Sequence, residues 1–300
     1  MPRTARKQTE KEEAGVTIAG IDLSSPDKVL WPGQGVTKQD LAEHWVRVAG
    51  LALPHIANRP LTLMRCPRGR QSFCFIQKHA RAGLHPAVAT MEVRERNGAA
   101  QPYPMATDVA GLVALAQIGV LEVHLFGAAA PDLEQPDRLV LDLDPGEDVA
   151  WAEVADAARL MRGRMQAAGL EPFLMWTGGK GLHVTAPLAP GADWDRARAL
   201  SEGLARSLEA EQPDRFTATA SKAGRKGRIY VDWLRNGFGA TAVAPYSPRA
   251  REGAPVALPM AWDDLRDRKP TVGVATLPDH LKSRGSDPWA GWKNAARKLS

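Results

Sequence analysis

The segment Arg138 to Gly146, with the sequence RLVLDLDPG, constrains the fold most, because it places two aspartates inside an otherwise apolar run. These acids, Asp142 and Asp144, are two positions apart. Side chains two positions apart point to the same face of a β-strand, so both carboxylates would project together near the strand's end. Two like charges this close repel each other and resist burial unless a cation compensates them. A divalent metal ion is the usual compensation. The simpler alternative is a turn that ends the strand at Asp144, Pro145 and Gly146.

Apolar side chains surround these two acids, which indicates a largely buried strand whose acids need a reason to be there. A second strand-like segment, IYVDWLRN at residues 229–236, supplies a third acid, Asp232. Three carboxylates suit magnesium or manganese, which prefer oxygen ligands, better than zinc, because few histidines or cysteines lie nearby in the sequence. The alternative is that Asp232 simply pairs with Arg235 or with an arginine of residues 215–228.

The composition indicates a globular protein. The 300 residues are 44% hydrophobic, which suffices for a buried core. The longest apolar region, residues 111–130, is interrupted by polar side chains, so we expect no transmembrane helix. Residues 1–14 are polar and mixed in charge, and they predict a disordered tail rather than a secretory signal. We expect a single domain over residues 15–300, in which residues 270–300 form a peripheral segment.

The two cysteines, Cys66 and Cys74, argue against a disulfide scaffold and fit a reducing compartment. They could face each other across a hairpin, and the sequence assigns them no role. Because the N-terminus also lacks the apolar core of a secretory signal, we expect a cytoplasmic protein.

Positive charge is concentrated in two stretches without acids, within a formal net charge of +5. Such stretches most often form solvated faces. Interleaved aromatic side chains and nearby metal-type acids suit a polyanion better. The first stretch contains Arg65, Arg68, Arg70, Lys78 and Arg81 with Phe73 and Phe75 among them, and the second contains Arg215, Lys222, Arg225, Lys226 and Arg228.

Helical and strand-like patterns alternate along the chain, and hairpin-like turns join some of them. This predicts an α/β (α+β) fold with mixed, partly antiparallel sheets flanked by helices. Helices are expected from a capping box at Thr37 to about Leu51, from Thr107 to about Ile118, from Val149 to Ala168 with Asp148 as the cap, and from about Asp193 to Ala210. Strands are expected over residues 16–21, 61–65, 72–77, 121–126, 138–146, 173–176, 182–186 and 229–234.

A glycine-rich turn with the sequence TGGKGLH spans residues 177–183. It lacks the spacing of a P-loop and opens no helix. Its chemistry still suits phosphate, because small residues let backbone N–H groups approach closely while Lys180 adds a positive charge and Thr177 a hydroxyl group. His183 is in strand register with this turn and could point toward the same site. The simpler alternatives are an ordinary hairpin with an exposed lysine and a satisfied core histidine.

Four motifs, in this order, make the chain similar to a known family. They are LDLDPG at residues 141–146, GGKGLH at 178–183, VDWLRN at 231–236 and APYSPRAR at 244–251. From about Val16 to the C-terminus, the chain resembles the polymerase domain of bacterial ATP-dependent DNA ligase D, of the archaeo-eukaryotic primase superfamily. The resemblance implies a primase-like catalytic core. It also implies a DNA-repair polymerase of non-homologous end joining, which adds ribonucleotides or deoxyribonucleotides to DNA ends and gaps.

The resemblance also implies roles for individual residues. Two manganese or magnesium ions would be held by Asp142, Asp144 and Asp232, and the incoming nucleoside triphosphate by His124, Thr177, Lys180, His183 and Arg249. The 5′-phosphate of a DNA end would be held by Lys28 and Lys38, and a template base would stack on Phe75. The implied partners are DNA ends, nucleoside triphosphates, the end-binding protein Ku and a DNA ligase. No membrane contact is implied, and the location would be the nucleoid.

The sequence departs from the family pattern at two positions. Many relatives carry two adjacent aromatic residues where this chain has Phe75 and Ile76, so a smaller stacking platform is expected; Thr177 replaces the commoner serine and keeps the hydroxyl group. The Lys-x-Asp-Gly motif of a ligase nucleophile is absent, so we expect a stand-alone polymerase or a part of a longer protein. Two alternatives remain open at this point: a non-catalytic module that binds DNA ends, and a primase that starts strands without a primer.

Overall fold

Two main β-sheets organise the chain in the computed structural model, which describes residues 15–221 and 223–299. The expectation for residues 1–14 lies outside the described residues. A four-stranded antiparallel sheet has the order β15 (Thr241–Val243), β9 (Val120–Phe126), β5 (Leu61–Arg65) and β6 (Phe75–Gln77). A six-stranded sheet has the order β13 (Phe216–Thr217), β14 (Ile229–Asp232), β10 (Arg138–Pro145), β12 (Leu182–Pro187), β11 (Phe173–Trp176) and β16 (Leu258–Met260). Its pairs are antiparallel except for β13 with β14, so the predicted mixed-sheet fold is confirmed.

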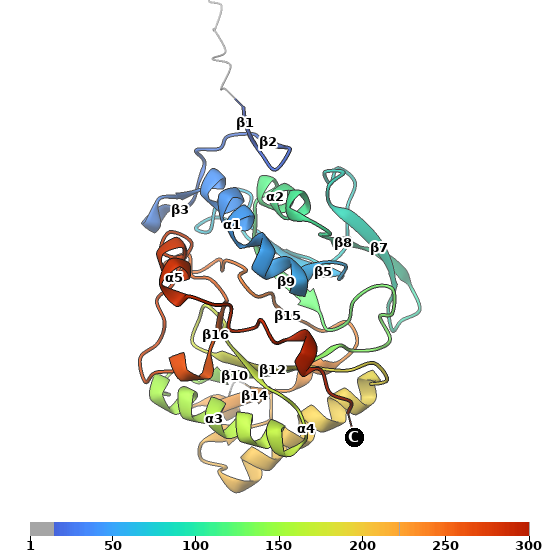
Figure 1. Ribbon diagram of the computed structural model, residues 1–300, viewed down its shortest axis with the longest axis vertical. Coiled ribbons are helices and arrows are strands. Elements are labelled where there is room, and N and C mark those ends of the chain that lie inside the picture. The colour runs from blue at the N-terminus through green and yellow to red at the C-terminus, as the bar shows by residue number, and fades with distance from the viewer. Residues whose placement is uncertain (1–14, 222, 300) are drawn as a thin grey trace, which may run out of the picture.

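Helices cover both sheets, and short hairpins complete the fold (Figure 1). Helices α1 (Lys38–Ile56) and α2 (Val109–Gln117) pack together beside the four-stranded sheet, whereas α3 (Trp151–Ala167) and α4 (Trp194–Glu211) lie against the six-stranded sheet. A fifth helix, α5 (Leu277–Arg284), follows late in the chain. The hairpins are β1 (Val16–Ile18) with β2 (Ile21–Leu23), β3 (Val29–Trp31) with β4 (Val36–Thr37), and β7 (Ala89–Arg94) with β8 (Ala100–Met105). Short 3₁₀ helices span Pro32–Gln34, Ala223–Arg225, Leu234–Asn236, Trp262–Asp264 and Lys293–Ala295.

The alternation of side chains along β10 explains how this strand is oriented. Leu139, Leu141 and Leu143 are fully buried and lie on one face of the strand. Because α3 and α4 contact this strand, the leucine row is on the face that the helices cover. Asp142 and Asp144 therefore lie on the opposite face, away from the helices, as the sequence pattern predicted.

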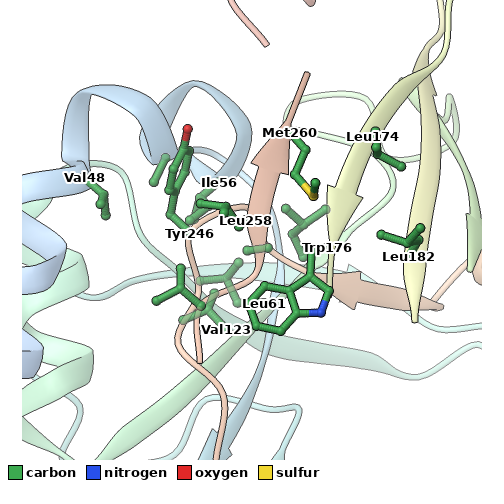
Figure 2. Packing of buried hydrophobic residues seen from close by; sticks show 14 of the residues in the cluster. Val48, Ile56, Leu61, Val123, Leu174, Trp176, Leu182, Tyr246, Leu258 and Met260 are labelled. Carbon is green, nitrogen blue, oxygen red and sulfur yellow. The ribbon is translucent and has the colours of Figure 1, made fainter. Parts of the chain in front are cut away.

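One continuous apolar cluster joins the two sheets. Figure 2 shows Val48 and Ile56 from α1 and Leu61 from β5 close to Tyr246 and Leu258, with Trp176 and Met260 beside them. These side chains come from both sheets and from the segment between β15 and β16. Burial of a large aliphatic side chain contributes about 1.5–3 kcal/mol, so this shared core holds the facing sheets at a defined separation.

Several element boundaries differ from the sequence-based expectations for local reasons. Residues 16–21 do not form one strand, because the chain turns at Ala19 and Gly20 into the β1–β2 hairpin. Helix α2 is capped by Asp108 rather than Thr107, since the Asp108 side chain accepts the Gly111 N–H at 2.9 Å. Helix α3 begins only at Trp151, where Glu153 rather than Asp148 accepts a terminal N–H. The strand expected over residues 72–77 begins at Phe75, and the strand expected over residues 229–234 ends at Asp232.

The two cysteines and the C-terminal segment also differ from expectation. Cys66 and Cys74 are joined in a disulfide that closes the loop between β5 and β6. Although we expected residues 270–300 to be peripheral, Trp289 and Trp292 of this segment are buried with stacked rings, and the Trp289 indole donates to the Leu174 carbonyl at 3.0 Å. None of the helices in the described part of the chain is both long and apolar enough to cross a membrane.

Candidate active site

A row of three polar side chains crosses the middle of the six-stranded sheet. Asp142 on β10 is directly opposite His183 on β12 and directly opposite Asp232 on β14. Directly opposed residues of antiparallel strands share a face, so all three side chains project to the same side. Asp144, two positions along β10, shares that face. The His183 ring lies 3.5 Å from the Asp142 carboxylate.

Close backbone packing brings the glycine-rich turn up to these acids. A Cβ atom at Gly181 would come within 2.4 Å of the Leu143 carbonyl oxygen, so only glycine allows β12 to start this close to β10. Within the turn, the Thr177 hydroxyl donates to the Gly181 carbonyl at 3.0 Å, and the Trp176 indole donates to the Gly179 carbonyl at 2.9 Å. Lys180 is exposed at the tip of the turn. The turn is therefore rigid, while its lysine remains accessible.

Two arginines compensate the aspartates. Arg235 lies 3.3 Å from Asp142 and 3.1 Å from Asp232, and Arg225 lies 2.7 Å from Asp144. The ion pair between Asp232 and Arg235, which the sequence offered as the simpler alternative, is thus present. Asp232 also stands directly opposite Asp142 in the sheet. Asp232 also accepts the Tyr230 hydroxyl at 3.1 Å.

The aspartates have different protonation tendencies. Burial acts to raise the pKa of Asp142, but the charges and hydrogen bonds of His183 and Arg235 outweigh it and lower the pKa to about 2. Burial and the nearby Asp142 charge raise the pKa of Asp144, against the opposing charge of Arg225. The raised pKa of Asp144 means that the nearby cations do not fully compensate the negative charge of this acid cluster. Additional positive charge would therefore favour the ionised form of Asp144.

The donor set fits a hard divalent cation, because it consists of three carboxylates on one sheet face. As arranged in the described residues, no group of three Asp, Glu, His or Cys side chains is close enough to hold a metal ion. Arg225 and Arg235 instead contact the carboxylate oxygens that such ions would need. Magnesium or manganese would therefore have to displace these two guanidinium groups.

A buried ion-pair cluster lies on the facing four-stranded sheet. Glu122 and His124, two positions apart on β9, are joined by a 2.9 Å contact between the His124 Nε2 and a Glu122 carboxylate oxygen. The same carboxylate lies 3.1 Å from Nε of Arg249, and Nη1 of Arg249 donates to the Thr177 carbonyl. This cluster links β9, the segment after β15 and the glycine-rich turn.

The two sheets enclose one cleft of about 200 Å³ between these groups. Seven of the eight side chains assigned to catalysis or nucleotide binding line this cleft, and Asp232 lies beside it through its opposition to Asp142. The cleft therefore brings two carboxylates together with the cations Lys180, Arg235 and Arg249, a combination that a triphosphate with divalent cations requires. The lining residues are His124, Asp142, Asp144, Thr177, Gly179, Lys180, Gly181, His183, Arg235, Ala242, Val243, Arg249 and Arg251.

Lys28 and Lys38, assigned to a DNA 5′-phosphate, lie together away from this cleft. The Lys38 N–H donates to the Lys28 carbonyl at 2.9 Å, and burial followed by the Lys28 charge lowers the pKa of Lys38. The Lys38 side chain is buried, and its ammonium group contacts Ser24 and Gln117. Lys28 is only partly buried, and its ammonium group donates to the Pro67 carbonyl at 2.6 Å. Lys28 is thus the more accessible of the two cations.

A stacked aromatic pair, the exposed Phe73 and the half-buried Phe75, lies on the loop and strand that follow β5. The Phe73 and Phe75 rings stack with centroids 5.8 Å apart and an interplanar angle of 22°. Phe73 is 76% exposed and Ile76 is 67% exposed, although large apolar side chains normally avoid water. The Arg65 guanidinium lies 5.5 Å from the Phe75 ring centroid. Phe73 thus places a second ring against Phe75, and the smaller stacking platform expected from Ile76 stays a prediction.

Sequence reasoning did not assign Arg225, Arg235, Arg251 or Glu122 to the site. In the sequence, Arg225 belongs to the second basic stretch, and Arg235 is a basic neighbour of Asp232. Glu122 is one of the polar side chains that interrupt the apolar region 111–130, and a glutamate in a buried strand is itself a signal that a cation or donor lies nearby.

Comparisons with known proteins agree with this geometry. Residues 37–289 match the family described as LigD, primase-polymerase domain. The multifunctional non-homologous end joining protein LigD of Pseudomonas aeruginosa is 34% identical over 99% of this chain and 36% of its own length. The LigD protein of Mycobacterium tuberculosis is 36% identical over 82% of this chain and 34% of its own length. The chain therefore spans about a third of the length of these curated relatives.

A solved structure of the polymerase domain from Mycobacterium tuberculosis ligase D in complex with DNA superposes with a TM-score of 0.85. It is 33% identical, and the match covers 92% of this chain and 99% of that domain. The resemblance inferred from the four motifs and the expected primase-like fold are thus confirmed. The chain belongs to the LigD primase-polymerase domain family, a family of nucleotidyltransferases.

Proposed function

We propose that this chain is a DNA-repair polymerase of non-homologous end joining, which adds ribonucleotides or deoxyribonucleotides to DNA ends and gaps. The observation that carries this proposal is the cleft between the two sheets, which Asp142 and Asp144 line together with Lys180 and Arg249. Acids that suit divalent cations, close to bases that suit phosphates, are what nucleotidyl transfer requires. Family membership supports the same reaction class.

In this proposal the acids and the bases of the cleft have different tasks. Asp142, Asp144 and Asp232 would hold two manganese or magnesium ions, which supply charge stabilisation when a 3′-hydroxyl attacks the α-phosphate. Lys180 and Arg249 neutralise the β- and γ-phosphates, while His124, Thr177 and His183 orient the nucleotide. Arg225 and Arg235 keep the acids compensated until substrate arrives. No side chain becomes a covalent nucleophile.

DNA would bind outside the cleft, on the surface that carries Lys28, Phe73 and Phe75. Lys28, assisted by Lys38, would contact the 5′-phosphate of a DNA end, and the aromatic pair would stack on an unpaired template base. Ku and a separate DNA ligase are the expected partners, and this role places the protein at the nucleoid in the cytoplasm. The Mycobacterium tuberculosis domain was solved in complex with DNA, which supports a DNA substrate here.

A primer-extension assay tests this proposal. A gapped DNA with a labelled primer and a 5′-phosphate is incubated with ribonucleoside or deoxyribonucleoside triphosphates and either manganese or magnesium. We expect extension by the natural chain and none by the double variant Asp142→Ala, Asp144→Ala, with DNA binding retained by both. Binding without extension by the natural chain would instead identify a non-catalytic end-binding module, and extension of unprimed template would identify a primase.

A further inference from the structure

We infer that Glu122 is a positioning residue, whose buried carboxylate holds both His124 and Arg249 in place for the nucleoside triphosphate. This inference rests on the proposed function and names a residue that the sequence motifs do not assign. Glu122 is on β9, where its neighbours Leu121 and Val123 are buried and apolar. Its side chain is only 7% exposed, so its charge has little access to water.

Two hydrogen-bond partners and one ion-pair partner, from two segments of the chain, surround this carboxylate. Oε2 lies 2.9 Å from the His124 Nε2 and 3.1 Å from the Arg249 Nε, and Oε1 accepts the Ala250 N–H at 2.8 Å. Burial acts to raise the pKa of Glu122, but His124 and Arg249 outweigh it and lower the pKa to about 2. The carboxylate is therefore ionised and able to act as the common acceptor for two residues of the cleft.

The contacts restrict the geometry of both partners. The ionised Glu122 carboxylate can only accept hydrogen bonds. Its contact with the His124 ring therefore places a proton on Nε2, and in a neutral ring Nδ1 is then the hydrogen-bond acceptor. Burial lowers the pKa of His124 and favours this neutral form. With its Nε side held by Glu122, the Arg249 guanidinium keeps its far end toward Thr177 in the cleft wall. Both side chains are thus preorganised before the nucleotide binds.

Binding of a nucleoside triphosphate to Glu122→Gln tests the inference directly. The amide has the same shape but cannot pair with a cation, so we expect the dissociation constant to rise about tenfold or more, the range for loss of a charged hydrogen bond. Isothermal titration with a non-hydrolysable triphosphate and manganese gives this constant without catalysis. Glu122→Asp, which keeps the charge on a shorter side chain, should restore part of the affinity. Binding by Glu122→Gln at the natural affinity would overturn the inference.

A double-mutant cycle separates positioning from folding. Because Glu122 acts partly through Arg249, Glu122→Gln should weaken triphosphate binding less in an Arg249→Ala background than in the natural chain, and the remaining loss is the part that acts through His124. Multiplying effects of the two changes would contradict a shared role. Glu209→Gln is a matched control, because Glu209 accepts the Thr217 hydroxyl at 3.0 Å and does not line the cleft. It should bind triphosphate normally.

DNA affinity and extension complete the test. Glu122→Gln should bind gapped DNA as the natural chain does, since the polar contacts of Glu122 involve His124, Arg249 and Ala250 rather than Lys28 or Phe73. Loss of DNA and triphosphate binding together would show that Glu122 serves only folding. Should Glu122→Gln fail to fold, the comparison of Glu122→Asp with the control gives the same distinction. A natural chain that binds triphosphate but extends no primer would refute the proposed function while leaving the role of Glu122 measurable.

Discussion

The Arg235 guanidinium lies between two aspartates, with Nη2 3.3 Å from Asp142 Oδ2 and 3.1 Å from Asp232 Oδ2. A single cation thus compensates the two carboxylates that stand opposite each other on β10 and β14. Both aspartate side chains are largely buried, with 15% and 11% exposure, so their repulsion is weakly screened.

Removal of this cation should make stability depend on divalent metal. Arg235→Ala removes the one guanidinium group that two buried carboxylates share, and we expect the free energy of unfolding to fall by about 1–3 kcal/mol in a chelator. Manganese should restore more stability to the variant than to the natural chain, because it supplies the missing positive charge. Thermal melts with and without manganese measure this difference. Arg206→Ala, which breaks an exposed pair with Glu202, is the control, and an equal response of both variants to manganese would count against the prediction.

Lys28 should discriminate between DNA ends. Lys28→Ala removes an accessible ammonium group, so we expect about tenfold weaker binding to DNA with a 5′-phosphate and little change for DNA with a 5′-hydroxyl. Fluorescence anisotropy at one fixed salt concentration gives both constants. Lys282→Ala on α5 removes the same charge from an exposed site and should not discriminate. Equal weakening for both DNA ends would refute the assignment of Lys28.

Phe73 should contribute to binding of unpaired template. Stacking of a base on an aromatic ring contributes roughly 1–3 kcal/mol, so Phe73→Ala should weaken binding of DNA with a template overhang about 5- to 150-fold. Blunt duplex, which offers no unpaired base, should bind unchanged. A 2-aminopurine in the overhang reports stacking through its fluorescence. Val46→Ala, at another exposed apolar position, is the control, and unchanged quenching in Phe73→Ala would exclude this role.

Stability should fall in mild acid because of a buried histidine. His44 is fully buried, and burial lowers its pKa from 6.5 to about 4 although its contact with the Tyr246 carbonyl at 2.8 Å acts in the other direction. The unfolded chain therefore binds a proton at higher pH than the folded chain does, so stability decreases as the pH falls from 6.5 to about 4. The loss amounts to roughly 3 kcal/mol, since one pKa unit corresponds to about 1.4 kcal/mol.

Urea unfolding of the natural chain and of His44→Gln at pH 7 and pH 4.5 checks this expectation. Glutamine does not titrate, so the variant should lose less stability between the two pH values. The comparison isolates His44 from other titrating groups, which both proteins share. Parallel losses in the two proteins would mean that His44 is not responsible.

Local patterns predicted the elements that depend on consecutive residues. The alternation of leucine and aspartate around Asp142 predicted which side chains share a face of β10. The capping box was also readable, because Thr37 and Asp40 exchange hydrogen bonds over one helical turn. The strand Phe173–Trp176 was predicted with its observed ends. Such features depend on backbone periodicity and short-range hydrogen bonds, which neighbouring residues determine by themselves.

The composition of the cleft was decided by tertiary structure. The motifs identified the family and most of the cleft, but not that Arg235 would reach Asp142 over 93 positions or that Glu122 would bind the Ala250 N–H over 128 positions. These contacts exist because β14 pairs with β10 and because the segment after β15 returns to β9. Strand pairing brings charges together that are far apart in the sequence, so no local pattern reveals these contacts. The sequence by itself determined the elements, the family and the acids, whereas the folded chain decided which cations compensate those acids.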